Sequence, residues 1–157
     1  MAYAEGTTVA FERSVSEIVA LVKRAGAMQV AQQDMEDSYT IAFQLDDRLI
    51  KFRLPVPVMD EMPVRDGRGS TLSNSQRLNK LAQSKRQRGR ALLLVIKAKL
   101  ESVESGIETI EQAFLANIVL SDGATVHERI SQPIAIEYRE GRPDTAVGLL
   151  PPPGGAK

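Results

Sequence analysis

The chain has 157 residues, no cysteine, and equal numbers of basic and acidic side chains, 20 of each. A chain of this length fits one domain, and without cysteine it has no disulfide, no thiolate metal site and no cysteine nucleophile. Because the net charge is zero, the molecule is not a polycation that nucleic acid attracts as a whole. A charged partner must therefore recognise a local patch.

The sequence lacks the usual marks of export and membrane insertion. Its longest apolar run, residues 91–96, is far shorter than the roughly 20 residues that span a bilayer. The first residues do not show the basic-then-apolar order of a signal peptide. We therefore expect a cytoplasmic protein without a membrane partner.

The N-terminal part predicts an arm or edge strand and then a short helix. Residues 7–9 are β-prone, so we expect either a short strand or an ordered arm there. Ser14 and Glu17 have the spacing of a capping box, and apolar residues follow at helical intervals. Gly26 stands where a left-handed C-cap is needed, so the predicted helix runs from the capping box to this glycine.

The following residues predict three antiparallel strands. Met28 and Val30 alternate with polar or small neighbours, and a longer alternation runs through residues 39–54. Asp46-Asp47 interrupts that longer alternation, which predicts a hairpin turn. Pro55 then ends the pairing because proline has no amide donor.

Beyond the strands we expect a long loop and several helices. Residues 58–74 are rich in Gly, Pro, Ser, Thr and Asn, which is typical of a loop. Residues 75–105 have no proline and predict one long helix that contains Gly89 and ends at Gly106. Residues 107–120 predict another helix.

A last predicted helix begins at Thr125, is kinked or restarted by Pro133 and is closed by Gly141. The predicted class is therefore α+β: an N-terminal helix, a three-stranded antiparallel sheet with a hairpin at 39–54, a long loop, a long helix at 75–105 and C-terminal helices. We expect one domain over residues 1–142 and a Pro/Gly-rich tail at 143–157.

The two charges are separated along the chain. Residues 65–99 hold ten basic side chains and one acidic one, whereas residues 100–140 hold two basic and eight acidic ones. On the predicted long helix, Lys85 and Lys99 fall within the apolar stripe and Arg88 lies beside it. The first half of this helix is therefore expected to extend past the core or to face a polyanion or an acidic partner, whereas residues 91–96 predict the centre of the core or a dimer seam.

We interpret the basic half of this helix and the adjoining Gly-rich loop as a surface that binds the phosphates of DNA or RNA. The block contains no aromatic residue, so contacts with the nucleic-acid backbone are expected to outweigh base stacking. Two alternatives remain: a solvated helix face, and a surface for an acidic protein. The candidate nucleic-acid-binding residues are Arg65, Arg68, Arg77, Lys80, Lys85, Arg86, Arg88 and Arg90.

Catalytic and metal-binding patterns are missing from the sequence. The order of elements, a helix, three strands and a helix, resembles that of the double-stranded-RNA-binding domain. The resemblance is topological only, because the loop before the second helix is much longer here and the Gly-Ser-Lys-Lys sequence that begins that helix in the family is absent. Restriction-type nucleases share that order, but Leu49 replaces the acid of their (Asp/Glu)-x-Lys motif before Lys51. His127 is the only histidine and has no nucleophile motif to serve. We expect a non-enzymatic protein without metal or cofactor.

Three blocks of the sequence carry a resemblance to a known group of proteins. They are residues 12–27, residues 51–55, and residues 90–107 followed by 111–120 and Asp122-Gly123. In these blocks the chain resembles a group of small tailed-bacteriophage proteins of unknown function. The resemblance implies a phage accessory protein in the bacterial host cytoplasm, and it implies no catalytic residue.

Binding of nucleic acid is the function that we expect of such an accessory protein. The alternatives are an interaction module acting on a host enzyme or defence complex, and a structural protein that assembles into a homo-oligomer.

Overall fold

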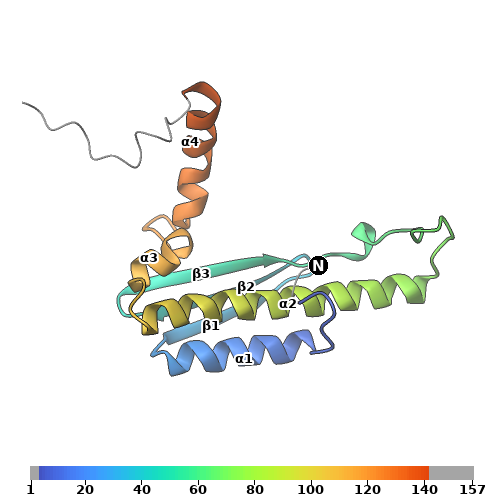
Figure 1. Ribbon diagram of the computed structural model, residues 1–157, viewed down its shortest axis with the longest axis horizontal. Helices are drawn as coiled ribbons and strands as arrows, with labels where there is room; N and C mark the ends of the chain where they lie inside the picture. The colour runs from blue at the N-terminus through green and yellow to red at the C-terminus, as the bar shows by residue number, and fades with distance from the viewer. Residues whose placement is uncertain (1–3, 142–157) are drawn as a thin grey trace, which may run out of the picture.

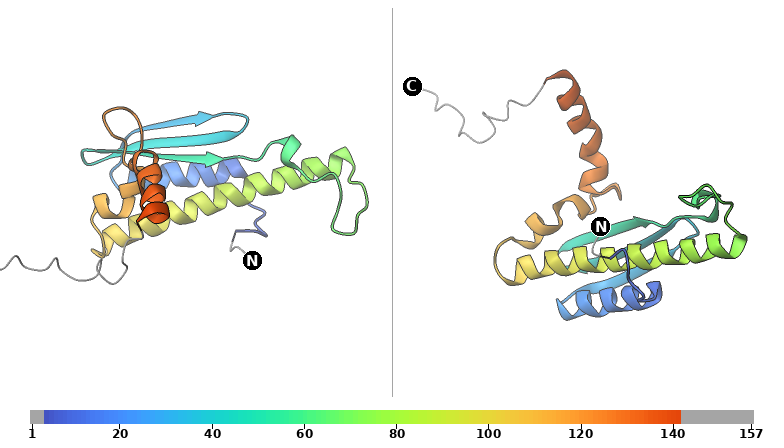
Figure 2. Two further views of the ribbon diagram at one scale, coloured as in Figure 1. Left: turned by 90° about the horizontal axis from the view of Figure 1, so that it is seen from above. Right: turned by 45° about the vertical axis from the view of Figure 1, so that its right-hand side comes forward.

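A three-stranded antiparallel sheet carries two helices on one of its faces (Figure 1) in the computed structural model, which describes residues 4–141. The strands lie in the order β1 (Met28–Asp34), β2 (Ser38–Leu45) and β3 (Arg48–Pro55). Helices α1 (Phe11–Arg24) and α2 (Asn74–Glu104) form the second layer (Figure 2). The predicted α+β class and element order are confirmed, and the predicted tail at residues 143–157 lies outside the described residues.

The β2–β3 hairpin supplies the inner face of the sheet. Ile41 pairs with Phe52 and Phe43 pairs with Ile50, and all four side chains are buried against the helices. The predicted Asp46-Asp47 turn is confirmed, and Asp46 has a φ of 51°. Aspartate tolerates this left-handed conformation better than most residues, which explains a tight hairpin without glycine.

Strand β1 departs from the predicted alternation at a bulge. Met28 pairs with Gln44 but Ala31 pairs with Ala42, so β1 contains one residue more than its partner there. The bulge includes Gln29, whose φ is 52°. An extra residue changes which face the following side chains point to. As a result Val30 packs against the core while Met28 is 67% exposed.

Helix α1 begins one turn earlier than predicted. Its N-cap is Ala10, and Ser14, which was predicted as the cap, is a fully buried residue inside the helix. Tertiary contacts explain the longer helix, because Phe11 packs edge-on against the ring of Tyr39 with centroids 5.4 Å apart. The predicted end is confirmed: Gly26 has a φ of 96° just after the C-cap.

The two helices are in close contact at Gly89. A Cβ atom built on this glycine would lie 2.6 Å from Cδ2 of Phe11 and 3.5 Å from Cβ of Ser14. Gly89 is buried within a continuous α2, although glycine is a poor helix former. The absent side chain is therefore what lets the start of α1 lie against α2.

We expect Gly89→Ala to lower the free energy of unfolding by about 1 kcal/mol, because the cost of overpacking exceeds the gain in helix propensity. In a Phe11→Ala background the clash is gone, and the same substitution should stabilise the protein by up to about 1 kcal/mol. Urea unfolding of the four proteins measures both effects. Equal changes in the two backgrounds would contradict the packing role of Gly89.

Helix α2 has the predicted length to within one residue at each end. Ser73 and Gln76 form a capping box at its start, and Gly106, with a φ of 74°, follows its end. Of the apolar run at residues 91–96, Leu92, Leu93 and Ile96 are buried in the core of this single chain. That run therefore serves mainly as core.

The predicted helix over residues 107–120 is wrong in extent. The structure has a short α3 (Ile110–Phe114), a 3-10 helix η2 (Leu115–Asn117) and then an extended segment. Ile118 forms a bridge with Ile50, so this segment supplies hydrogen bonds to the edge of β3. Pairing with the sheet competes with the helix here and ends it.

Helix α4 (Val126–Glu140) starts at Thr125, as predicted, and its C-cap is Gly141. It runs through Pro133 without a restart, and it points away from the two layers (Figure 1). No helix within residues 4–141 is both long and apolar enough to cross a bilayer.

Tyr39 makes this fold less stable at strongly alkaline pH. Its hydroxyl donates to Oε1 of Gln32 at 2.8 Å, and burial, followed by the charge of Asp34, raises its pKa to about 12. The unfolded tyrosine titrates near pH 10, so the folded state loses stability as the pH rises from about 10 to 12. Below pH 10 the stabilisation is complete.

Between pH 8 and about pH 11, we expect the free energy of unfolding to fall by about 1 kcal/mol more in the wild type than in Tyr39→Phe. The difference of two pKa units sets an upper bound of about 2.7 kcal/mol, and solvent near Gln32 lowers the effect. Urea unfolding at the two pH values provides the measurement. Parallel losses in both proteins would exclude a contribution from Tyr39.

Candidate nucleic-acid interface

The candidate cations lie in the loop that leads into α2 and along α2 as far as Arg90, and the start of this helix extends past the sheet (Figure 1). Arg65 and Arg68 belong to the loop, five others belong to the first half of α2, and Arg90 lies just beyond its midpoint. Helix α1 lies alongside the second half of α2 only, because its first residue contacts Gly89. The first half of α2 therefore projects without a helical neighbour.

The loop has a defined turn at its tip. Oδ1 of Asp66 accepts hydrogen bonds from the amides of Arg68 and Ser70 at 2.9 and 2.8 Å. Arg65 forms a β-bridge with Thr71 across the turn. Both arginine side chains are exposed at this tip.

Two arginines on one side of α2 hold the chain between the sheet and the loop. Arg77 donates to the carbonyl oxygens of Met59 and Met62 at 2.9 and 3.2 Å. Arg88 donates to the carbonyl oxygen of Pro55 at 2.8 Å. These contacts order residues 55–62, which include the 3-10 helix η1 (Met59–Glu61).

The other side of α2 holds the N-terminal segment. Arg86 donates twice to Oε1 of Gln83, whose amide nitrogen donates to the carbonyl oxygens of Glu5 and Thr7 at 3.0 Å each. Residues 4–10 are consequently an ordered arm and not a strand. Arg90 forms an ion pair with Glu17 of α1 at 3.0 Å. The structure therefore divides the α2 arginines between two sides of the helix.

Within residues 4–141, most of these cations form no ion pair. Carbonyl and amide oxygens are neutral, so the hydrogen bonds of Arg77, Arg86 and Arg88 leave a full positive charge on each side chain. Within residues 4–141, Arg90 alone among the eight candidates is paired with a carboxylate. Residues 59–88 hold seven basic and three acidic side chains. This end of the molecule is thus locally positive.

Arg53 is a further cation that the sequence did not bring to notice. It lies near the end of β3 and, with Arg88, lines a surface hollow of about 390 Å³ that also contains the carboxylates of Asp37 and Glu61. In the sequence it is only a polar position of a half-buried strand. Its closeness to α2 follows from the packing of β3 against the helix layer.

Two further hollows are lined by different sets of residues. One of about 520 Å³ lies at the far end of α2, where Leu45 and Leu100 line it and neither His, Ser nor Thr does. His127 is an exposed residue in the first turn of α4, as the sequence predicted, and it lines a hollow of about 180 Å³ together with Lys51 and Glu128. In the described part of the chain, no three Asp, Glu or His side chains are grouped to hold a metal ion.

Fold and charge define a small two-layer α+β protein with one basic, projecting end. Compared with protein-family models, curated proteins and solved structures, the chain matches none of them.

The hydrogen bonds of Arg77 to Met59 and Met62 predict that this side chain keeps the loop before α2 ordered. Arg77→Ala removes two hydrogen bonds to the chain at residues 59–62, so amide hydrogen exchange across residues 59–72 should become faster. Lys80→Ala removes the same charge from the same helix and makes no polar side-chain contact within residues 4–141, so it serves as the control. Equal exchange in the two variants would show that Arg77 does not hold the loop.

Proposed function

We propose that this protein is a non-enzymatic accessory protein, as its resemblance to the tailed-phage group implies, and that it binds the phosphate backbone of DNA or RNA. The observation that carries the proposal is the excess of unpaired positive charge on the loop and the first half of α2. Each cation that contacts a phosphate releases condensed counterions, which makes such binding favourable and dependent on salt.

The contacts of the cations divide them into two groups, those fixed by hydrogen bonds and, within the described residues, those free to move. Arg77, Arg86 and Arg88 are fixed by hydrogen bonds to neutral oxygens and present their charge from ordered positions. Arg68 and Lys80 are exposed and have no polar side-chain partner within residues 4–141, so a bound phosphate can recruit them directly. Without aromatic side chains in this region, the binding should depend little on base sequence.

The test compares two charge-matched triple variants. In the first variant, Arg65, Arg68 and Lys80 are replaced by Gln. In the second variant, Lys23, Arg24 and Lys97 are replaced by Gln; these are exposed cations at the end of α1 and in the second half of α2, outside the proposed surface. Fluorescence anisotropy with labelled single- and double-stranded DNA and RNA measures affinity over a range of salt concentrations. Circular dichroism checks that both variants stay folded.

We expect the first variant to bind at least roughly tenfold more weakly at low salt, with the salt slope reduced by about 0.7 to 0.9 for each lost contact. The second variant should bind within about twofold of the wild type, because its cations lie outside the proposed surface. Absence of binding to all four probes at low salt would overturn the proposal. Equal weakening in both variants would show that only the overall charge matters and would overturn the assigned surface.

A further inference from the structure

Helix α4 exposes an apolar face that nothing within residues 4–141 covers. Every residue from 127 to 140 is exposed, and Ile130, Ile134 and Tyr138 are 41%, 45% and 65% exposed. Figures 1 and 2 show the helix standing away from both layers. Such a face on a projecting helix calls for an occupant.

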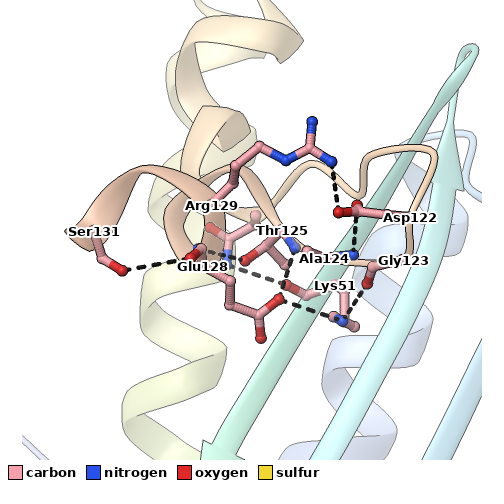
Figure 3. A network of polar contacts seen from close by, with 9 residues as sticks. Lys51, Asp122, Gly123, Ala124, Thr125, Glu128, Arg129 and Ser131 are labelled. Atoms are coloured by element: carbon pink, nitrogen blue, oxygen red, sulfur yellow. Dashed lines mark hydrogen bonds and ion pairs between the residues drawn. The ribbon is translucent and has the colours of Figure 1, made fainter. Parts of the chain in front are cut away.

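The first turn of α4 and the loop before it, which we call the root of α4, are held by contacts with β3, so the direction of the helix is fixed by the fold. Figure 3 shows Lys51 of β3 donating to the carbonyl oxygen of Gly123 at 3.0 Å and lying 3.8 Å from the carboxylate of Glu128. The amide of Thr125 donates to that carboxylate at 2.7 Å, and this hydrogen bond, with a contribution from the Lys51 charge, lowers the pKa of Glu128. Arg129 pairs with Asp122 at 2.6 Å.

Beyond its root, α4 lacks the contacts that normally stabilise a helix of its size. It has 15 residues and contains Pro133, which removes one of its internal hydrogen bonds. Isolated helices of this length are marginal in water, and most helices in proteins are stabilised by burial of an apolar face. Coverage of the α4 face would supply that stabilisation.

The apolar residues of α4 are arranged symmetrically along the helix. Ile130, Ile134 and Tyr138 recur every four residues, so they share a stripe about 80° wide. In an antiparallel pair of α4 helices, Ile134 would meet its own copy and Ile130 would meet Tyr138. The stripe is therefore complementary to itself, which a two-fold symmetric interface requires.

The charges along one flank of the stripe show the same complementarity. Arg129, Glu137 and Glu140 lie within about 80° of one another on the helix surface. Antiparallel pairing brings Arg129 of one copy beside Glu137 and Glu140 of the other, once at each end of the seam. Arg129 already contacts Asp122 through one terminal nitrogen, and Figure 3 shows its other terminal nitrogen without a contact among the drawn residues.

We propose that α4 is a homodimerisation helix that pairs in antiparallel fashion with α4 of a second copy. A helix of this length is only about 22 Å long, so the seam falls short of the roughly 800 Å² per partner of a stable interface. The dimer is therefore weak, with a dissociation constant in the micromolar range or above. Because α4 lies at the opposite end of the molecule from the basic loop (Figure 1), this dimer is independent of nucleic-acid binding.

Sedimentation velocity of the full chain over a wide concentration range tests this dimer. The wild type should shift from monomer to dimer with rising concentration, and Ile134→Glu should remain a monomer. Ile136→Glu is the matched control, since Ile136 lies on the same helix, is 36% exposed and points about 200° away from Ile134. This control should dimerise like the wild type.

A charge-swap pair tests the orientation of the two helices. Arg129→Glu should weaken the dimer, and the added Glu140→Arg change should restore at least part of the affinity only if the helices are antiparallel. A wild type that stays monomeric at every concentration would overturn the proposal and leave a different protein as the occupant. A dimer that survives Ile134→Glu as well as Ile136→Glu would also overturn it, because its seam would lie elsewhere.

Discussion

The contact between Phe11 and Gly89 sets the geometry on which the other features of this protein depend. Because residue 89 has no side chain, the start of α1 lies directly against α2, and the same phenylalanine reaches Tyr39 of the sheet. From this point onward α1 and the second half of α2 run together over the sheet and bury Ile18, Val22 and Ile96. Since α1 begins there, the earlier turns of α2 have no helical neighbour and project with their cations.

Arginine is suited to such a projecting end because it can be structural and charged at once. A guanidinium that donates to backbone carbonyls fixes the chain that carries them while its charge remains available. Arg77 and Arg88 do this for residues 55–62. Two cations on or beside the apolar stripe of α2 have partners in the protein itself. Arg88 donates to the carbonyl oxygen of Pro55 at the end of β3. Lys99 lies over the ring of Phe114 and donates to the carbonyl oxygen of Ala113.

The segment after α3 connects the sheet to the second projecting part of the molecule. Ile118 pairs with the edge of β3, and the chain then turns back so that Thr125 can begin α4. Lys51, from the same strand, holds that turn. Strand β3 thus gains a bridge at one point of its edge and also orients a helix. The basic end and α4 lie toward opposite ends of the long axis (Figure 1), so the proposed binding and the proposed self-association would use separate surfaces.

The sequence by itself determined the α+β class, the three strands, the long helix and most of the glycine-dependent ends, because periodicity, capping and left-handed glycines act over a few residues. It also located the charged segment. Only the tertiary structure decided the rest. Phe11 extended α1 past the predicted cap, a bulge turned Met28 outward, and the edge of β3 ended the helix predicted at residues 107–120. Likewise, which arginines contact the protein's own carbonyl groups, and that Arg53 lies beside Arg88, depend on contacts between segments far apart in the chain, which local sequence patterns do not encode.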